Sequence, residues 1–193
     1  MKYAQLPVDT FEKMQLSAGI ILDTFDPKTK EIGTIIGATS GGVNFKATPT
    51  YSDFGEDIDN CPKNTMELKK LDTWEALMTG TMISVSAETI KNLLGAADID
   101  ADDPTHIVPR TDILEEDFDD VWWVGDYSQF NGEKNGGHCA IHLKNTLSTD
   151  GFQIQSTDKK KGTFPFTYTA HYSMKNIKEV PFEIYIEAGT EED

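Results

Sequence analysis

The sequence predicts a mainly β protein, with antiparallel sheets in a β-sandwich or barrel-like arrangement flanked by one short α-helix. Apolar and polar residues alternate in several segments, which is typical of strands with one buried face. Turn sequences such as Asp150-Gly151 separate these segments, and residues 87–94 stand out by their helical spacing. With 193 residues, the chain is expected to form a single domain spanning residues 1–193.

Three strand-like segments are predicted in the first half of the chain. The first is a short strand at Ala18–Phe25, and the second has alternating apolar positions from Val43 to Tyr51. A long strand is expected at Leu71–Val85, where the alternation is weak because both faces are partly apolar. The intervening residues 49–66 are predicted to form a long loop extension, because such loops in compact domains are usually functional or mobile.

One helix is predicted, at Ala87–Leu94. Ser86 is a favourable N-cap residue, Glu88 lies in the first turn, and Gly95 is a typical helix terminator. The helix has little more than two turns, so it must pack against the rest of the protein to be stable.

The second half is predicted to end in antiparallel strands. Residues 137–175 are interpreted as a meander, with a middle strand around Phe152 and Ile154 and a third strand at Phe164–Met174. The last strand is expected at Val180–Ala188. Its predicted buried face consists of Val180, Phe182, Ile184 and Ile186.

The chain is strongly acidic, with a net charge of −16. This charge argues against a nucleic-acid-binding protein and against docking on anionic lipid, since both need Lys and Arg. Residues 98–120 form an acidic insertion with one Arg110, predicted to be irregular. Asp98, Asp100 and Asp102 resemble the start of an EF-hand, but the glycine and the final glutamate are missing. A solvated loop is therefore favoured, and calcium binding there stays open.

No sequence motif indicates catalysis. The chain has no nucleophile elbow, Walker loop, dinucleotide fingerprint or zincin helix, so we expect no enzymatic activity, no cofactor and no metal site. Cys61 and Cys139 are interpreted as reduced thiols, although spacing alone does not exclude a disulfide. His138 and His142 are interpreted as surface or interface histidines rather than zinc ligands. No apolar run reaches the ~20 residues of a membrane span, so no membrane anchoring is expected.

Trp122 and Trp123 are candidate interface aromatics. Adjacent residues on a strand face opposite sides, so one indole is expected in the core and the other exposed or covered by a partner. An exposed tryptophan leaves a second hypothesis open, a carbohydrate- or ligand-binding β-sandwich module.

The layout and several phrases resemble the major tail protein, or tail tube protein, of long-tailed, siphovirus-like bacteriophages. The phrases are TPTYSDFGEDID at 48–59, the segment 68–74, ETIKNLLGAA at 88–97, AHY at 170–172 and VPFEIYI at 180–186. The resemblance implies that six copies form a ring and that stacked rings form the hollow tail tube through which phage DNA is delivered. The related inner tube of a contractile tail or a secretion-system ring stays open.

The resemblance also implies partners and contact residues. It predicts contacts with other copies and with tape measure, terminator and distal tail proteins, in the virion tail after assembly in the host cytoplasm. DNA would pass without specific binding, and an acidic wall would let it slide. The long loop is expected to reach a neighbouring subunit or ring. Its candidate contact residues are Tyr51, Asp53, Phe54, Glu56, Asp57 and Asp59.

Overall fold

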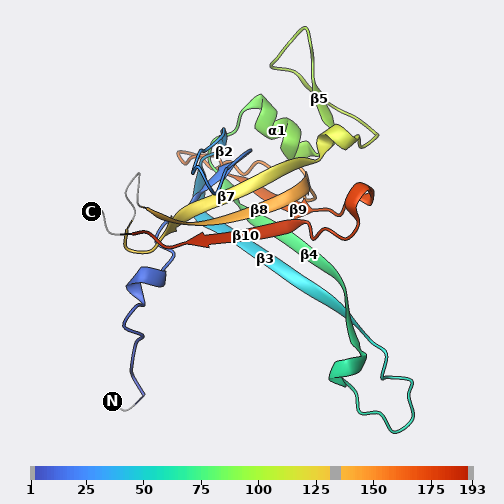
Figure 1. Cartoon of the computed structure of the whole chain (residues 1–193). Coiled ribbons are helices and arrows are strands. Elements are labelled where there is room, and N and C mark those ends of the chain that lie inside the picture. Colours follow the sequence, from blue (N-terminus) through green and yellow to red (C-terminus); the bar gives the residue numbers. More distant parts are fainter. Residues whose placement is uncertain (1–2, 131–135, 191–193) are drawn as a thin grey trace.

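The computed structural model describes residues 3–130 and 136–190. In this part the protein is mainly β, with antiparallel sheets and one short α-helix, which confirms the predicted fold class (Figure 1). The strands are β1 (Ile20–Leu22), β2 (Ile35–Gly37), β3 (Thr39–Asp53), β4 (Lys69–Met82), β5 (Ala97–Ile99), β6 (Ile107–Pro109), β7 (Asp119–Tyr127), β8 (Gly137–Ser148), β9 (Phe164–Ala170) and β10 (Phe182–Glu187), and the helix is α1 (Ala87–Leu94).

The large sheet has the strand order β2-β1-β7-β8-β9-β4-β3, and β10 also pairs with β8. Strand β8 therefore changes partner along one edge, from β10 at residues 138–143 to β9 at residues 146–148. Asn145, between these two stretches, has a left-handed φ of 48°, and the register with β7 shifts between Asp119 and Val121. Such an irregularity bends a strand and increases its twist.

The main core lies between the two halves of this bent sheet. It combines side chains from β1, β7 and β8 with side chains from β4 and β9, and α1 adds Leu93. This arrangement places the apolar faces of the alternating strands in one interior, as the sequence predicts for 43–47, where Val43, Phe45 and Ala47 pack against the core. The fully buried side chains of this core include Ile21, Met78, Met82, Leu93 and Leu143.

The helix has the predicted bounds and the predicted caps. The Ser86 hydroxyl accepts a hydrogen bond from the Thr89 amide at 3.1 Å, and Gly95 ends the helix with a φ of 79°. The Thr89 hydroxyl donates to the Ile36 carbonyl at 2.9 Å, which ties α1 to β2. The expectation that this short helix packs on the rest of the protein is therefore confirmed.

The predicted loop 49–66 is wrong at its start. Pro49–Asp53 belongs to β3, because these residues pair in register with 69–74 of β4. Proline is tolerated there because β3 is the outermost strand of the sheet. The loop proper begins at Phe54, and β4 runs from Lys69 to Met82 rather than from Leu71 to Val85.

Three further boundaries differ from the prediction. The acidic insertion 98–120 is not irregular throughout, since it contains most of the β5–β6 hairpin, a 3₁₀ helix at Glu115–Asp117 and the start of β7. No strand forms at 152–154; the β8–β9 connection has one isolated bridge, between Gln155 and Thr163. Strands β1 and β9 are shorter than expected, because their flanking residues have no ladder partner beyond isolated bridges.

Candidate assembly surfaces

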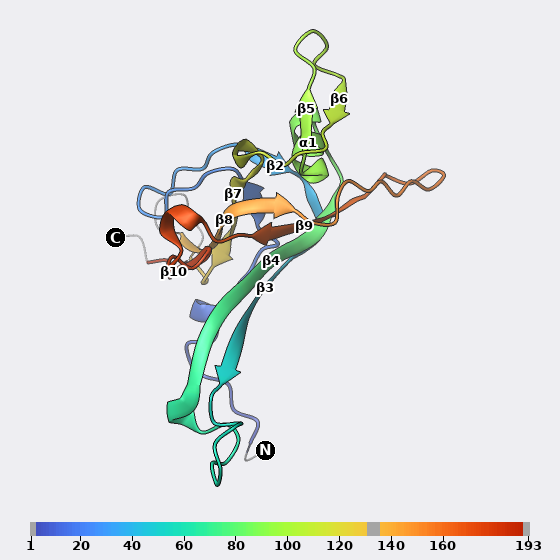
Figure 2. The same ribbon diagram turned by 90° about the vertical axis from the view of Figure 1, so that its right-hand side faces the viewer.

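The outer part of the β3–β4 hairpin, residues 48–75, projects from the body of the protein, and we call it the arm (Figures 1 and 2). Strand β9 pairs with β4 only along residues 77–82. In the described part of the chain, β4 therefore has no strand neighbour on that side from Lys69 to Ala76. One polar group of this edge is satisfied, because the Trp74 amide donates to the Tyr172 hydroxyl at 2.9 Å. An open edge of this kind is a template for pairing with another chain.

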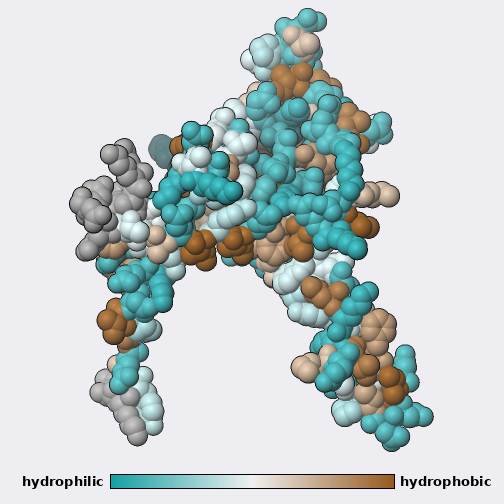
Figure 3. Space-filling view, in the orientation of Figure 1, coloured by the Kyte–Doolittle hydropathy of each residue, from teal (hydrophilic) through white to brown (hydrophobic). Residues whose placement is uncertain are grey.

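Large apolar side chains are exposed along the arm. Phe54 is 59% and Met66 is 79% exposed, and Figure 3 shows hydrophobic residues along this limb. The exposed apolar residues of the arm are Tyr51, Phe54, Ile58, Met66 and Leu71. Clustered exposed apolar residues of this kind mark interaction sites more often than scattered ones do.

The tip of the arm has its own internal order. One Asp53 carboxylate oxygen accepts a hydrogen bond from the Gly55 amide at 3.0 Å, and the other accepts from the Asn64 amide at 2.9 Å. These two bonds hold the pKa of Asp53 below its ordinary value, because they favour the charged form. Lys69 donates to the Asn64 side chain at 2.7 Å. Asp53 therefore links the two sides of the loop at the tip of the arm and stabilises its conformation.

The other candidate contact residues of the loop have different surroundings. Tyr51 and Phe54 are exposed, and the Lys69 ammonium lies 5.7 Å from the centre of the Tyr51 ring. Glu56 forms an exposed ion pair with Lys63 at 3.1 Å, and Asp57 and Asp59 are exposed. Sequence reasoning missed Ile58, Met66 and Leu71, although apolar residues within so acidic a segment were a usable signal.

A second limb, the N-terminal limb, is formed by residues 3–16 (Figures 1 and 3). It is tied to the body by the Leu16 amide, which donates to the Asp126 carbonyl at 2.9 Å, and by the Ser128 amide, which donates to the Met14 carbonyl at 2.9 Å. Nothing in the sequence analysis pointed to this segment. Its exposed apolar residues are Tyr3, Leu6, Val8, Phe11, Met14 and Leu16.

The apolar face of β10 lies between the two limbs. Ile184 and Ile186 are 50% and 61% exposed, so the prediction that this face is buried along its whole length is wrong. Phe182 does reach the core, where its ring lies 5.7 Å from Phe45 and 5.6 Å from Trp74. Beyond Phe182, no second layer covers the two isoleucines in the described part of the chain.

The two candidate interface aromatics, Trp122 and Trp123, are buried, at 7% and 8% exposure. Trp123 lies in the main core and donates its indole N–H to the Ala18 carbonyl at 3.0 Å. Trp122 lies in a second cluster with Leu22, Phe25 and Ala140, on the opposite face of the sheet. The expectation that one indole is exposed or covered by a partner is therefore wrong, because a second apolar cluster of the same chain, which the sequence pattern did not reveal, covers Trp122. The carbohydrate-binding hypothesis depended on an exposed tryptophan of this pair, and neither of the two is exposed.

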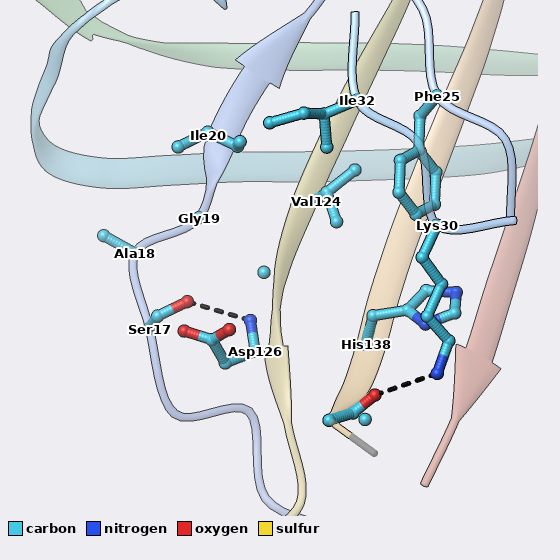
Figure 4. Close-up of a pocket in the computed structure, with 13 residues that line it drawn as sticks. Ser17, Ala18, Gly19, Ile20, Phe25, Lys30, Ile32, Val124, Asp126 and His138 are labelled. Atoms are coloured by element: carbon cyan, nitrogen blue, oxygen red, sulfur yellow. Dashed lines mark hydrogen bonds between the residues drawn. The ribbon is translucent and has the colours of Figure 1, made fainter. Parts of the chain in front are cut away.

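The two histidines of β8 differ. His142 stacks on Trp122, with 4.0 Å between ring centres and 7° between planes, and its Nε2 lies 2.8 Å from the Asp120 carboxylate. His138 is already buried within the single chain, so its interpretation as a surface or interface residue is wrong. Burial lowers the pKa of His138. It lines a broad hollow of about 530 Å³, with Phe25 and Lys30 beside it (Figure 4). Lys30 donates to the Gly136 carbonyl at 3.2 Å there.

The acidic insertion is organised around its single arginine. The Arg110 side chain lies 2.9 Å from the Asp98 carboxylate and also binds the Asp117 carboxylate, which is almost fully buried. Of the three EF-hand-like aspartates, Asp98 is thus paired with Arg110, and Asp100 accepts a hydrogen bond within its own turn from the Asp102 amide at 2.9 Å. Over residues 3–130 and 136–190, no group of three or more His, Cys, Asp or Glu is arranged to hold a metal ion.

Both cysteines, Cys61 in the arm and Cys139 in β8, are free thiols, as expected. Burial raises the pKa of the Cys139 thiol. Among the described residues, none of the helices has the length and apolar character that crossing a membrane requires.

No protein-family model matches the sequence, and no curated protein matches it either. Among solved structures, one chain of the "Virion of native gene transfer agent (GTA) particle" matches with a TM-score of 0.42 and 8% sequence identity. The match covers 89% of this chain and 96% of that chain. A similarity of this size supports no assignment of function.

Proposed function

We propose that this chain is a structural subunit of a phage tail, in which copies of it assemble into stacked hexameric rings that form the hollow tube for DNA delivery. The arm is the observation that carries the proposal. It combines an open β4 edge from Lys69 to Ala76 with exposed apolar side chains such as Phe54 and Met66. A lone monomer gains nothing from such a projection, whereas a neighbouring copy can pair with the edge and cover the apolar surface.

The positions of the two limbs favour a head-to-tail contact between copies. The arm and the N-terminal limb both project from the body, and β10, whose Ile184 and Ile186 are exposed, lies between them (Figure 1). A contact between different surfaces of identical subunits produces a ring when the rotation closes and a filament when it does not. A tube of stacked rings needs two different contacts between copies: one that closes each ring, and one that joins each ring to the next.

The charge of the chain suits a conduit for DNA. A net charge of −16 would repel phosphate groups, so DNA would slide past the wall rather than bind to it. Repulsion is screened over ~8 Å at physiological salt, so the acidic side chains must line the channel itself. In this proposal the tape measure, terminator and distal tail proteins are further partners of the assembled tube.

The arm can be removed cleanly to test the proposal. Pro49 and Trp74 pair across the hairpin, so residues 50–73 can be replaced by Asn-Gly, which favours a tight two-residue turn. The full chain is expected to form rings or tubes in negative-stain microscopy. The variant is expected to stay monomeric by analytical ultracentrifugation and to keep a cooperative thermal unfolding transition, which shows that the body still folds. A matched control replaces residues 101–105 at the tip of the β5–β6 hairpin by the same two residues and should still assemble.

Two results would contradict the proposal. One is tube formation by the variant without the arm. The other is a full chain that stays monomeric at high concentration and is present in only a few copies in its parent particle.

A further inference from the structure

An acidic cavity of about 420 Å³ lies where β7 begins and β8 ends, beside Asn92 of α1 and Ile36 of β2. It is separate from the arm and from the N-terminal limb. Four carboxylate side chains line it, those of Asp23, Asp117, Asp119 and Asp120.

Three of these carboxylates already have partners within the chain. Asp23 accepts from the Thr34 amide at 2.7 Å, Asp120 accepts from the Asn145 amide at 2.9 Å, and Asp117 binds Arg110. Across the described ranges, the Asp119 carboxylate has neither a hydrogen bond nor an ion pair. Desolvation is the main cause that raises the pKa of Asp119. The Lys91 ammonium lowers this pKa, and the nearby acidic side chains raise it further. Asp119 as a residue is exposed to solvent. A cation brought to this carboxylate would thus be favoured.

Two buried hydroxyl groups line the same cavity without a hydrogen-bond partner. Tyr168 is 3% exposed and Ser148 is 6% exposed, and these residues face each other across the β8–β9 pair. A buried hydroxyl without a partner is costly, so such groups usually receive a ligand or an ordered water. Together with Asp119 they supply three acceptors, which matches the three N–H donors of a primary ammonium group.

The chain carries a source of ammonium groups on a projecting segment. The β8–β9 connection, residues 149–163, projects from the body (Figure 2) and contains Lys159, Lys160 and Lys161 in sequence. Lys159 is 89% exposed at its side chain and has only a long, 3.9 Å ion pair with Asp158. Lys161 contacts the Ser40 hydroxyl at 3.3 Å. In a chain with an excess of acidic residues, this run is a local cationic feature.

We propose that a lysine ammonium of the 159–161 run of one copy binds in the acidic cavity of a neighbouring copy, with Asp119 as its charged partner and Ser148 and Tyr168 as hydrogen-bond acceptors. The cavity and the lysine run are different surfaces of one chain, so the contact is head-to-tail, and it can be repeated around a ring. This inference rests on the proposed self-assembly and specifies one of its contacts.

The test compares two variants with matched controls. Asp119→Asn removes the charge of the cavity, and the triple variant Lys159→Ser, Lys160→Ser, Lys161→Ser removes the cationic run. Each should raise the concentration needed for tube formation by about tenfold or more, because interfacial charge pairs are worth that much or more. Asp103→Asn on the β5–β6 hairpin and the double variant Lys28→Ser, Lys178→Ser change charge elsewhere and should assemble like the wild type.

A cross-link identifies the contact directly. In a Cys61→Ser, Cys139→Ser background, the pair Asp119→Cys and Lys160→Cys should form disulfides between copies, seen as a ladder of oligomers on non-reducing gels. The pair Asp103→Cys and Lys160→Cys should not. Thermal unfolding of Asp119→Asn monomers checks that the fold is retained.

The outcomes separate this inference from the proposed function. If the wild type forms tubes and either variant assembles at the wild-type concentration, the lysine contact is wrong while the tube proposal stands. If Asp119→Asn alone impairs assembly and the lysine variant does not, some other cation fills the cavity and the inference is overturned. If the wild type never assembles, the proposed function itself fails.

Discussion

The two halves of the β3–β4 hairpin have the same strands and one continuous antiparallel pairing, yet their surroundings are opposite. In the inner half, Ala76, Met78 and Met82 are fully buried, and β9 pairs with β4 along residues 77–82. In the outer half, the arm, Tyr51 and Leu71 are exposed, and β4 has no second strand neighbour among the described residues. Backbone pairing alone therefore does not decide which residues stabilise the monomer.

This contrast separates folding from assembly along a single hairpin. Burial of apolar surface contributes to the stability of the monomer in the inner half and at Trp74, where the arm joins the body. The arm keeps its apolar surface and its backbone edge available, so substitutions there should alter contacts between copies rather than the free energy of unfolding.

The largest expected difference is between two methionines of similar chemistry. Met78→Ala removes a fully buried side chain of the inner half and should lower the free energy of unfolding by about 2–5 kcal/mol. Met66→Ala removes a side chain that is 79% exposed and should change it by less than about 0.5 kcal/mol. Urea unfolding of the monomers measures both. Equal losses would show that the arm is part of the folding unit.

The next largest effect is expected from adding a side-chain atom at Gly80, where the inner half is closely packed. A Cβ atom on Gly80 would lie 2.7 Å from the Phe166 ring and 3.3 Å from the Gly42 carbonyl. Gly80→Ala should therefore cost about 1–3 kcal/mol of stability through overpacking. Thr73→Ala, on the exposed arm part of the same strand, is the control and should be close to neutral. A neutral Gly80→Ala would mean that the Phe166 ring of β9 moves aside at little cost.

A smaller, pH-dependent effect is expected at Asp119 in the body. Its pKa is raised in the folded state by desolvation first and by Asp120, Asp117 and Glu88, while Lys91 acts in the opposite direction. The charged form therefore destabilises the fold, so Asp119→Asn should raise the melting temperature at pH 7. The gain should shrink as the pH falls through the folded pKa toward the ordinary aspartate value, where both states become protonated. A gain that is equal at pH 7 and pH 3 would exclude this explanation.

The smallest global effect is expected at Asp53 in the arm. Its pKa is lowered by the bonds from the Gly55 and Asn64 amides, so its bracing is present above the ordinary aspartate pKa and is lost as the pH falls through the folded value. Asp53→Asn should leave the melting temperature unchanged and speed hydrogen exchange at the two amides. Unchanged exchange would show that the loop is held by other contacts.

The sequence predicted those features that depend on neighbouring residues. The helix bounds followed from Ser86 and Gly95, because caps act within one turn. The inward face of β3 followed from the alternation at Val43 and Phe45. The extension of β3 to Asp53 could not be predicted in this way, because its pairing partner lies beyond the loop. The turn-forming residues near the end of β3 also made this part of the strand look like part of the loop.

The incorrect predictions concern which apolar faces are covered by another layer of the protein, and which residues far apart in the sequence come together. Alternation shows that one face of β10 is apolar, but it does not show whether another layer covers Ile184. The same reasoning expected one indole of Trp122 and Trp123, without saying which, to be exposed or covered by a partner. It missed the second apolar cluster around Phe25, because that cluster is built from distant segments. The acidic cavity joins residues from 23 to 168, and no local pattern reveals such a group.

The charged residues along the open β4 edge have a consequence for the timing of polymerisation. Lys69, Lys70, Asp72 and Glu75 are all exposed there, and charges of this kind discourage indiscriminate pairing of unpaired strands. Pairing in a wrong register is thereby disfavoured, whereas a neighbouring copy that presents matching charges can pair. The concentration at which tubes begin to grow, and with it their number and length, would then be set by how readily a first matched ring forms.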